Sequence, residues 1–143
     1  MLTEKECEQL NRHTAGTMME TLGMTFIPTP DDAAVVGMTI SGANRQHQGI
    51  VHGGAYLAMA ETAAGAGSLH VAGLDASVCG VEVSGNHLHM SPTRGVVYAR
   101  ATLLTAGHTL HVWNVDITAD DGTLLSTARV VNRILMPKTP QKT

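Results

Sequence analysis

The chain is 143 residues long, and its 9 Lys and Arg against 12 Asp and Glu side chains give a formal net charge of −3. This length predicts one domain that buries roughly two thirds of its unfolded surface without metals or disulfides. No basic run interleaved with aromatic residues is present, which excludes a typical nucleic-acid binder. Cys7 and Cys79 lie far apart without Cys-x-x-Cys spacing, as reduced structural thiols do.

The N-terminal residues are charged where a signal peptide would be apolar. No apolar run approaches the ~20 residues that a membrane-spanning helix needs. We therefore expect a soluble, cytoplasmic protein with no membrane partner.

Two short helices are predicted within residues 3–23. Thr3 and Glu6 form a capping-box pattern that starts the first helix, and Gly23 ends the second. After a proline-rich turn, residues 34–40 alternate as the first strand of a sheet should.

An irregular polar segment, residues 41–51, precedes a helix at residues 55–69 that is apolar nearly all round. Such a helix is normally buried, yet it contains one charged residue, Glu61. An unpaired buried carboxylate costs several kcal/mol or has a raised pKa. We therefore expect Glu61 to be buried, and either matched by hydrogen-bond donors or kept as a reactive group in a dry site.

The second half of the chain changes to β-rich segments with short links, one of which is the hairpin signal Asp120-Asp121-Gly122. The segments are residues 77–90, 95–105, 109–119 and 123–135. Short links predict that successive strands are antiparallel neighbours. The expected fold is α+β, with a sheet of five strands curled around one long helix. The polar tail from about residue 137 is expected to be disordered.

Gln46, the His52-Gly53-Gly54 turn and Glu61, at these spacings and ahead of four predicted strands, resemble the signature of hotdog-fold acyl-CoA thioesterases. The similarity is greatest to glutamate-type 4-hydroxybenzoyl-CoA thioesterases and to 1,4-dihydroxy-2-naphthoyl-CoA hydrolases, and it covers about residues 25–135. It extends to residues 82–87, 107–109 and 111–113.

The resemblance implies a single hotdog domain over residues 1–143, in which a five- to six-stranded antiparallel sheet wraps a central helix. Two subunits join their sheets and build active sites at their interface, and such dimers usually pair into homotetramers. The implied reaction is hydrolysis of an aromatic or medium-chain acyl-CoA to the free acid and coenzyme A. Coenzyme A is part of the substrate, and the resemblance implies no cofactor and no metal.

Carried over by position, Glu61 matches the catalytic carboxylate of these enzymes, and Gly53 matches the backbone N–H that binds the thioester carbonyl. Gln46 and His52 match residues that line the reacting centre, and His87 matches a residue that contacts acyl or pantetheine groups. The remaining residues expected to bind substrate are Gly54, Gly65, His108, Thr109 and Arg94. Solvated surface charge is the competing interpretation for Arg94.

Gly65 marks a departure from the resemblance, because relatives carry Ser or Thr one helical turn after the catalytic Glu. In those relatives the hydroxyl can help to hold the substrate or the attacking water. The sequence does not identify the group that replaces it here.

Helix geometry separates Gly53 from Glu61 by ~12 Å, because each of the eight intervening steps rises ~1.5 Å. A helix N-terminus suits a developing oxyanion, but a carboxylate that far along the same helix cannot reach the same carbonyl. Two antiparallel helices across a two-fold axis solve the problem, since Glu61 of one subunit then faces Gly53 of the other. Glu61 can act either as general base or as nucleophile, and the sequence leaves both possibilities open.

Three alternatives compete with this interpretation. A non-catalytic acyl-CoA-binding module would keep the pocket but have no use for Glu61, and a hotdog dehydratase or hydratase would need an acid and base pair at the α- and β-carbons. Four histidines on predicted strands and turns could hold a metal, but no nearby Cys or Asp completes a ligand set. These histidines are His87, His89, His108 and His111.

Overall fold

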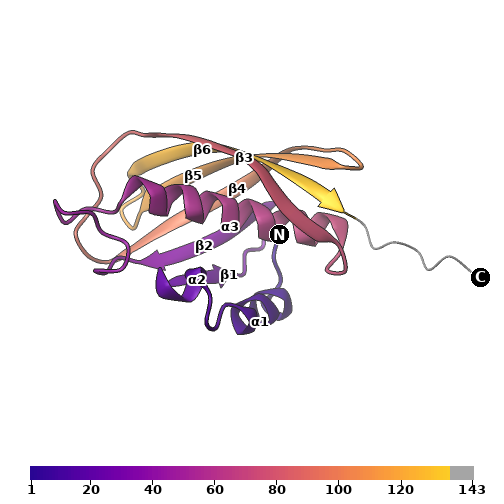
Figure 1. The fold of residues 1–143 in the computed structure, drawn as a ribbon, viewed down its shortest axis with the longest axis horizontal. Coiled ribbons are helices and arrows are strands. Elements are labelled where there is room, and N and C mark those ends of the chain that lie inside the picture. Colours follow the sequence, from indigo (N-terminus) through magenta and orange to yellow (C-terminus); the bar gives the residue numbers. More distant parts are fainter. Residues whose placement is uncertain (136–143) are drawn as a thin grey trace, which may run out of the picture.

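The computed structural model describes residues 1–135, where three helices pack against one six-stranded antiparallel sheet (Figure 1). The helices are α1 (Glu4–His13), α2 (Met18–Thr21) and α3 (Gly53–Ala72). The strands are β1 (Met24–Ile27), β2 (Ala33–Thr39), β3 (Ser77–His87), β4 (Val96–Ala106), β5 (Leu110–Ala119) and β6 (Leu124–Leu135), in the spatial order β1-β2-β4-β5-β6-β3. The tail predicted from residue 137 lies outside the described residues.

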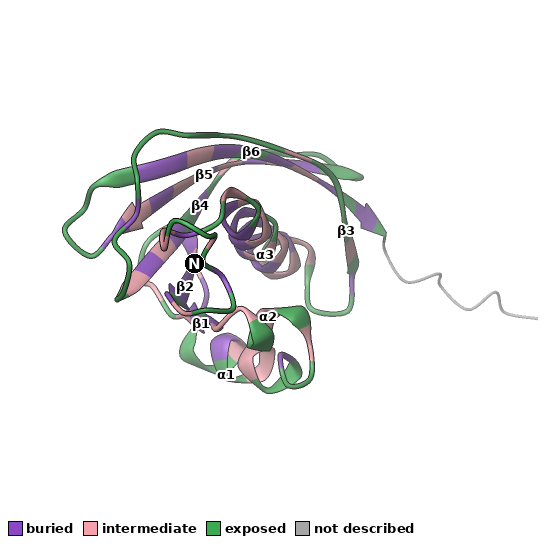
Figure 2. Ribbon diagram, turned by 60° about the vertical axis from the view of Figure 1, so that its left-hand side comes forward, coloured by how far each residue is buried: buried purple, intermediate pink, exposed green. Residues whose placement is uncertain are grey.

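The first of the two N-terminal helices confirms the capping signal. The Thr3 hydroxyl accepts a hydrogen bond from the Glu6 N–H at 3.2 Å, and the Glu6 carboxylate accepts one from the Thr3 N–H at 2.8 Å. Both helices lie below α3, on the side away from the curve of the sheet (Figure 2). They therefore border the part of α3 that the sheet leaves open.

β1 is a strand that the sequence analysis missed. Its four residues, between Gly23 and Pro28, are too few to show an alternating pattern. The strand pairs with β2, and its outer edge is met by α1, where the Asn11 amide group bonds to both backbone groups of Phe26. The sheet therefore has six strands, the upper number that the resemblance implied.

The prediction that every pair of successive strands is adjacent was wrong for β3 and β4. β3 pairs with β6, and β4 lies between β2 and β5. After β3 the chain still follows β6, since the N–H of Leu88 donates to the Leu125 carbonyl at 2.8 Å, and the link then crosses to β4. Short links do predict β4-β5-β6 correctly, because each of those links makes a tight turn.

One side of α3 packs tightly on the concave face of the sheet, as Figure 2 shows. Met59 and Ala63 are fully buried there, and a Cβ built on Gly67 would lie only 2.4 Å from the Trp113 ring. The helix can approach the sheet this closely because residue 67 has no side chain. Within residues 1–135 no helix, α3 included, has the length and hydropathy to cross a membrane.

Candidate active site

Glu61 lies on the open side of α3 and is exposed in the single chain, so the prediction that it is buried was wrong. The sheet wraps only part of the helix, and a stripe that contains Ala58, Glu61 and Gly65 stays partly or fully accessible. These positions recur every three to four residues, which places them on one helical face. The apolar composition predicted a helix buried on most sides, Glu61 included, but a single chain does not supply the cover for this face.

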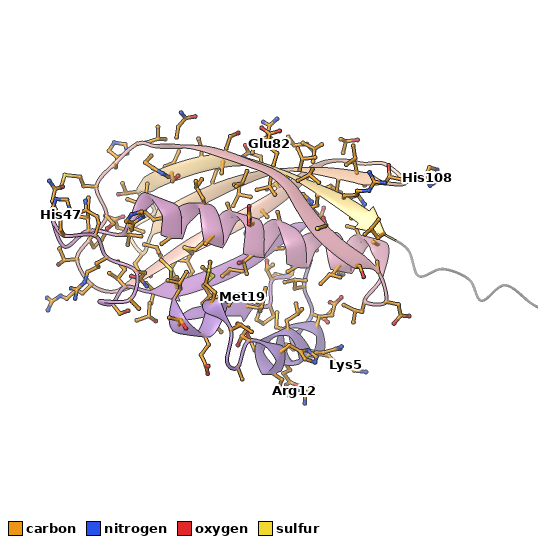
Figure 3. All side chains as sticks on the ribbon, in the orientation of Figure 1. Lys5, Arg12, Met19, His47, Glu82 and His108 are labelled. Carbon is orange, nitrogen blue, oxygen red and sulfur yellow. The ribbon has the colours of Figure 1, made fainter. Side chains whose placement is uncertain are left out.

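A cavity of about 360 Å³ adjoins Glu61, and apolar side chains from α1, α2, β1 and α3 line most of it. These include Leu10, Met19, Phe26, Ala66 and Leu69. Met19 projects from α2 into the space beneath α3 (Figure 3). The cavity thus combines a carboxylate with an apolar wall that an acyl chain or ring can contact.

Gly65 lies one turn after Glu61 and lines the same cavity. A Cβ built at this position meets no heavy atom within 4 Å. The space that a Ser or Thr side chain would occupy at this position is therefore open in the single chain, and no described side chain fills it.

A second cavity, of about 340 Å³, lies at the N-terminus of α3 and is lined by Gln46, Gly53 and His87. A Cβ on Gly53 would lie 2.6 Å from His87 Nε2, so this position requires glycine unless the ring moves. His52 is the N-cap of α3, and its Nδ1 accepts a hydrogen bond from the Gly54 N–H at 2.8 Å. Within residues 1–135 no hydrogen bond engages the Gly53 N–H, which remains available to an oxyanion.

His87 is oriented by Ser126. The Ser126 hydroxyl donates to the Asn86 carbonyl at 3.2 Å and therefore accepts from His87 Nδ1 at 2.9 Å. In the neutral ring this arrangement places the proton on Nδ1, so that Nε2, beside Gly53, is the acceptor. A ring nitrogen in this state can accept a hydrogen bond from a ligand in the cavity.

Tyr56 is a residue of this cavity that sequence reasoning missed. Its ring lies 5.5 Å from the His87 ring, and its buried hydroxyl has no hydrogen-bond partner within the described residues. Burial raises the pKa of Tyr56, and the nearby Ser91 hydroxyl offsets part of that rise. Helical spacing could have indicated it, because Tyr56 lies three residues after Gly53 and so shares its face.

The two cavities have no lining residue in common. The carboxylate of Glu61 and the free N–H of Gly53 therefore serve different cavities of one chain. Gln46, His52 and His87 gather around Gly53, whereas Gly65 lies with Glu61.

His108, Thr109 and Arg94 are exposed, and none of them lines either cavity. His108 lies on the hairpin between β4 and β5, at the end of the molecule opposite to His47 (Figure 3). His47 is in the loop that carries Gln46 to the N-terminus of α3. His108 and Thr109 thus lie far from the loop that precedes α3, whereas Arg94 lies in the link between β3 and β4, where the Thr93 carbonyl accepts a hydrogen bond from Arg45.

Among residues 1–135, no three His, Cys, Asp or Glu side chains come together as a metal site. His89 Nδ1 lies 2.8 Å from the Leu124 carbonyl oxygen, and His111 Nδ1 lies 3.1 Å from the Ser68 hydroxyl. The four histidines considered as ligands are therefore dispersed among different neighbours.

A buried polar network lies under the C-terminal half of α3. The Ser68 hydroxyl accepts hydrogen bonds from Trp113 Nε1 at 2.9 Å and from Asn132 Nδ2 at 3.0 Å. Its own proton then bonds to His111 Nδ1. Burial lowers the pKa of His111 and keeps the ring neutral, as this pattern requires.

β3 forms an open edge of the sheet. Of its eleven residues, Val78 and Val83 are half-buried and the others are exposed. A strand of this length with an unpaired edge is a template for pairing with another strand.

Comparison with known proteins identifies the family. A sequence profile of the thioesterase superfamily matches residues 48–126, which is more than half of the chain. The chain belongs to the thioesterase superfamily. Its members hydrolyse thioesters, and this protein is accordingly a thioester hydrolase.

Individual relatives agree with this assignment. The proofreading thioesterase of Cronobacter sakazakii is 30% identical over 128 residues, which cover 90% of this chain and 93% of that protein. The 1,4-dihydroxy-2-naphthoyl-CoA hydrolase of Listeria monocytogenes is 32% identical over 112 residues, which cover 78% of this chain and 90% of that protein. The crystal structure of a thioesterase from Haemophilus influenzae matches with a TM-score of 0.88 at 25% identity and covers 99% of this chain and 96% of that one. The predicted hotdog fold is confirmed.

Proposed function

We propose that this superfamily member hydrolyses acyl-CoA thioesters to a free acid and coenzyme A, with Glu61 as the catalytic carboxylate. The observation that carries the proposal is the position of Glu61, a lone acid on an otherwise apolar helical face beside an apolar cavity. A structural carboxylate would be expected to bond to donors, and within residues 1–135 no hydrogen bond or ion pair engages Glu61.

The chemistry needs one acceptor of a proton and one donor to the oxyanion. Water attacks the thioester carbonyl carbon, its proton passes to Glu61, and the carbonyl oxygen takes up negative charge that the Gly53 N–H stabilises. Collapse of this intermediate breaks the C–S bond and releases the coenzyme A thiolate. In the alternative route Glu61 attacks the carbonyl carbon itself, the C–S bond breaks and releases the coenzyme A thiolate, and water then hydrolyses the mixed anhydride.

The complete site is proposed to lie between two subunits. Within one chain Glu61 and Gly53 line separate cavities, and their ~12 Å separation along α3 excludes action on one carbonyl group. Pairing of the open β3 edges of two chains brings their α3 helices side by side around a two-fold axis. Each Glu61 then faces the N-terminus of the partner helix, and the accessible stripe of α3 becomes covered.

The acyl group is proposed to be aromatic or of medium length. A volume of about 360 Å³ lies at the lower end of the range for small-molecule pockets, about 300–1,000 Å³. The apolar lining suits a ring or a short chain. The similarity to the Listeria monocytogenes 1,4-dihydroxy-2-naphthoyl-CoA hydrolase supports an aromatic group.

Thiol release from benzoyl-CoA and hexanoyl-CoA, followed with a thiol reagent, tests the reaction. The wild-type protein should hydrolyse at least one of them, and Glu61→Gln should lower kcat/KM by two to three orders of magnitude. Binding of both esters without thiol release would instead indicate an acyl-CoA-binding module. Hydration of an enoyl-CoA without thiol release would indicate a hydratase.

Subunit complementation tests the shared site. Glu61→Gln removes the carboxylate in one chain. In the other chain Gly53→Pro removes the N–H at the first helical position, and it is combined with His87→Ala because a Cβ at position 53 would otherwise lie 2.6 Å from the His87 ring. Each variant alone should be inactive, but the two co-expressed with different affinity tags should form mixed dimers that contain one intact site. Recovered thiol release in the doubly tagged fraction supports the shared site, whereas an inactive mixed dimer contradicts it.

A further inference from the structure

Asn132, on β6, lies at the boundary between the buried network and the Glu61 cavity. The side chain is 1% exposed, and its Nδ2 donates to the Ser68 hydroxyl at 3.0 Å. Ser68 is itself fixed by Trp113 and His111. The network therefore sets which way the Asn132 amide faces.

The carbonyl oxygen of this amide is left without a partner. Among the described residues no donor bonds to Asn132 Oδ1, although Asn132 contributes to the lining of the Glu61 cavity. The oxygen is not among the fully buried atoms without a partner, so it reaches the cavity, where water or a ligand can supply a proton. Asn132 Oδ1 can therefore accept a hydrogen bond from a molecule in the Glu61 cavity.

Gly80 shows where that donor can lie. It is the direct partner of Asn132 across the β3-β6 pair. A Cβ built on Gly80 would lie 3.8 Å from Asn132 Oδ1 and 3.9 Å from Glu61 Oε1. The absence of a side chain thus leaves a space bordered by two acceptors, one neutral and one a carboxylate.

We propose that Asn132 Oδ1 and Glu61 together hold the attacking water in the space above Gly80. This inference rests on the proposed function with Glu61 as general base. It also identifies the group that takes over from the Ser or Thr absent at position 65, since Asn132 reaches the site from the sheet instead of from the helix.

Two acceptors are what a nucleophilic water requires. The water donates one proton to each oxygen, so a lone pair stays free to form the bond to the thioester carbon. The proton on the Glu61 side transfers to the carboxylate, the C–S bond breaks, and the thiolate leaves. The proton directed at Asn132 stays on the oxygen and becomes part of the acid product.

The first test compares Asn132→Leu with the wild-type protein on benzoyl-CoA and 4-hydroxybenzoyl-CoA. Loss of one water contact should lower kcat about tenfold to a hundredfold on both substrates with little change in KM. A loss confined to the hydroxylated substrate would overturn the proposal, because Asn132 would then recognise the acyl hydroxyl. Unchanged kcat would also overturn it.

Gly80→Ala provides a second test that leaves the Ser68 network intact. The added methyl occupies the space bordered by the two oxygens and makes only ordinary contacts of 3.8–3.9 Å. It should lower kcat at least tenfold while the urea unfolding midpoint stays within error. Normal turnover in Gly80→Ala would show that Asn132 matters only for packing.

Asn132→Asp adds a pH readout that a packing defect would not produce. A second carboxylate beside Glu61 disfavours its ionised form, so the acid limb of the kcat/KM profile should shift upward by about one pH unit. His13 is the other titratable side chain lining the cavity and is unchanged in this variant. An unshifted acid limb would contradict the proposal. A wild-type protein that hydrolyses no acyl-CoA would instead overturn the proposed function and this inference with it.

Discussion

The two edges of the sheet are finished in opposite ways. At one edge, β1 has four residues, and the Asn11 amide bonds to the Phe26 carbonyl oxygen at 3.1 Å and to the Phe26 N–H at 2.8 Å. A side chain thus takes the place of a neighbouring strand. At the other edge, β3 has eleven residues, most of them exposed, and no helix lies across its outer edge (Figure 2).

This difference would allow the proposed dimer to form without polymerising. A sheet with two open edges adds strands at both and grows into a filament, whereas one open edge permits a single closed pair. The open edge is also the one beside Glu61 and Gly80. In the proposed dimer, assembly and completion of the active site therefore depend on the same strand.

The largest expected effect comes from blocking the open edge. Val81 is a bulged residue of β3 with 56% of its surface exposed, and Val81→Lys places a charge on the edge where β3 strands would meet. We expect at least a tenfold weaker dimer by sedimentation and a matching loss of thioesterase activity at low protein concentration. Leu104→Lys is the control, because Leu104 is also bulged and is 51% exposed but lies on β4. Equal dissociation of both variants would contradict the role of β3.

An intermediate effect is expected from opening the closed edge. Asn11→Leu removes both bonds to Phe26 and leaves its N–H and carbonyl without partners, which costs about 1–3 kcal/mol. The urea unfolding midpoint should fall, and light scattering should detect assemblies larger than those of the wild-type protein. Asn11→Asp retains an acceptor for the Phe26 N–H, so its unfolding midpoint should lie between those of the wild type and Asn11→Leu. A Leu variant as stable as the wild type would show that β1 does not depend on Asn11.

The smallest effect is expected from the contact between Glu6 of α1 and His70 of α3. This contact attaches the helix that carries Asn11. Desolvation raises the pKa of Glu6, but hydrogen bonds from Thr3 and from His70, at 2.8 Å, lower it by more, so its pKa lies below the ordinary 4.5. A lowered carboxyl pKa stabilises the fold above pH 4.5, and this contribution disappears as the pH falls through the lower folded value.

Comparison with Glu6→Gln isolates this contribution. The wild type should be more stable than the variant at pH 7 by less than about 1 kcal/mol, because the pair is partly exposed. The difference should close as urea unfolding is repeated at pH values below 4.5. A difference that persists at low pH would mean that Glu6 acts by packing and not by charge.

Local sequence signals predicted the elements well. The capping box at Thr3, the glycines at the start of α3 and the hairpin signal before β6 each act within a few residues, so the sequence displays them directly. The candidate catalytic motif was equally visible, because Gly53 and Glu61 lie on one helix at a fixed spacing.

Long-range features escaped the sequence analysis. The pairing of β3 with β6, rather than with β4, depends on how the sheet closes around α3, and no residue in the link between β3 and β4 encodes it. The exposure of Glu61 was missed because an all-apolar helix does not reveal which face a single chain leaves uncovered. Asn132 gave no signal, since it meets Glu61 only through the fold.

The contact between Gly67 and Trp113 gives the protein a built-in optical reporter. Trp113 is the only tryptophan of the chain, is fully buried, and lies against the α3 backbone. Its fluorescence emission therefore comes from one place, the junction of helix and sheet. Ultraviolet excitation alone can follow the docking of α3 during refolding, without any attached dye.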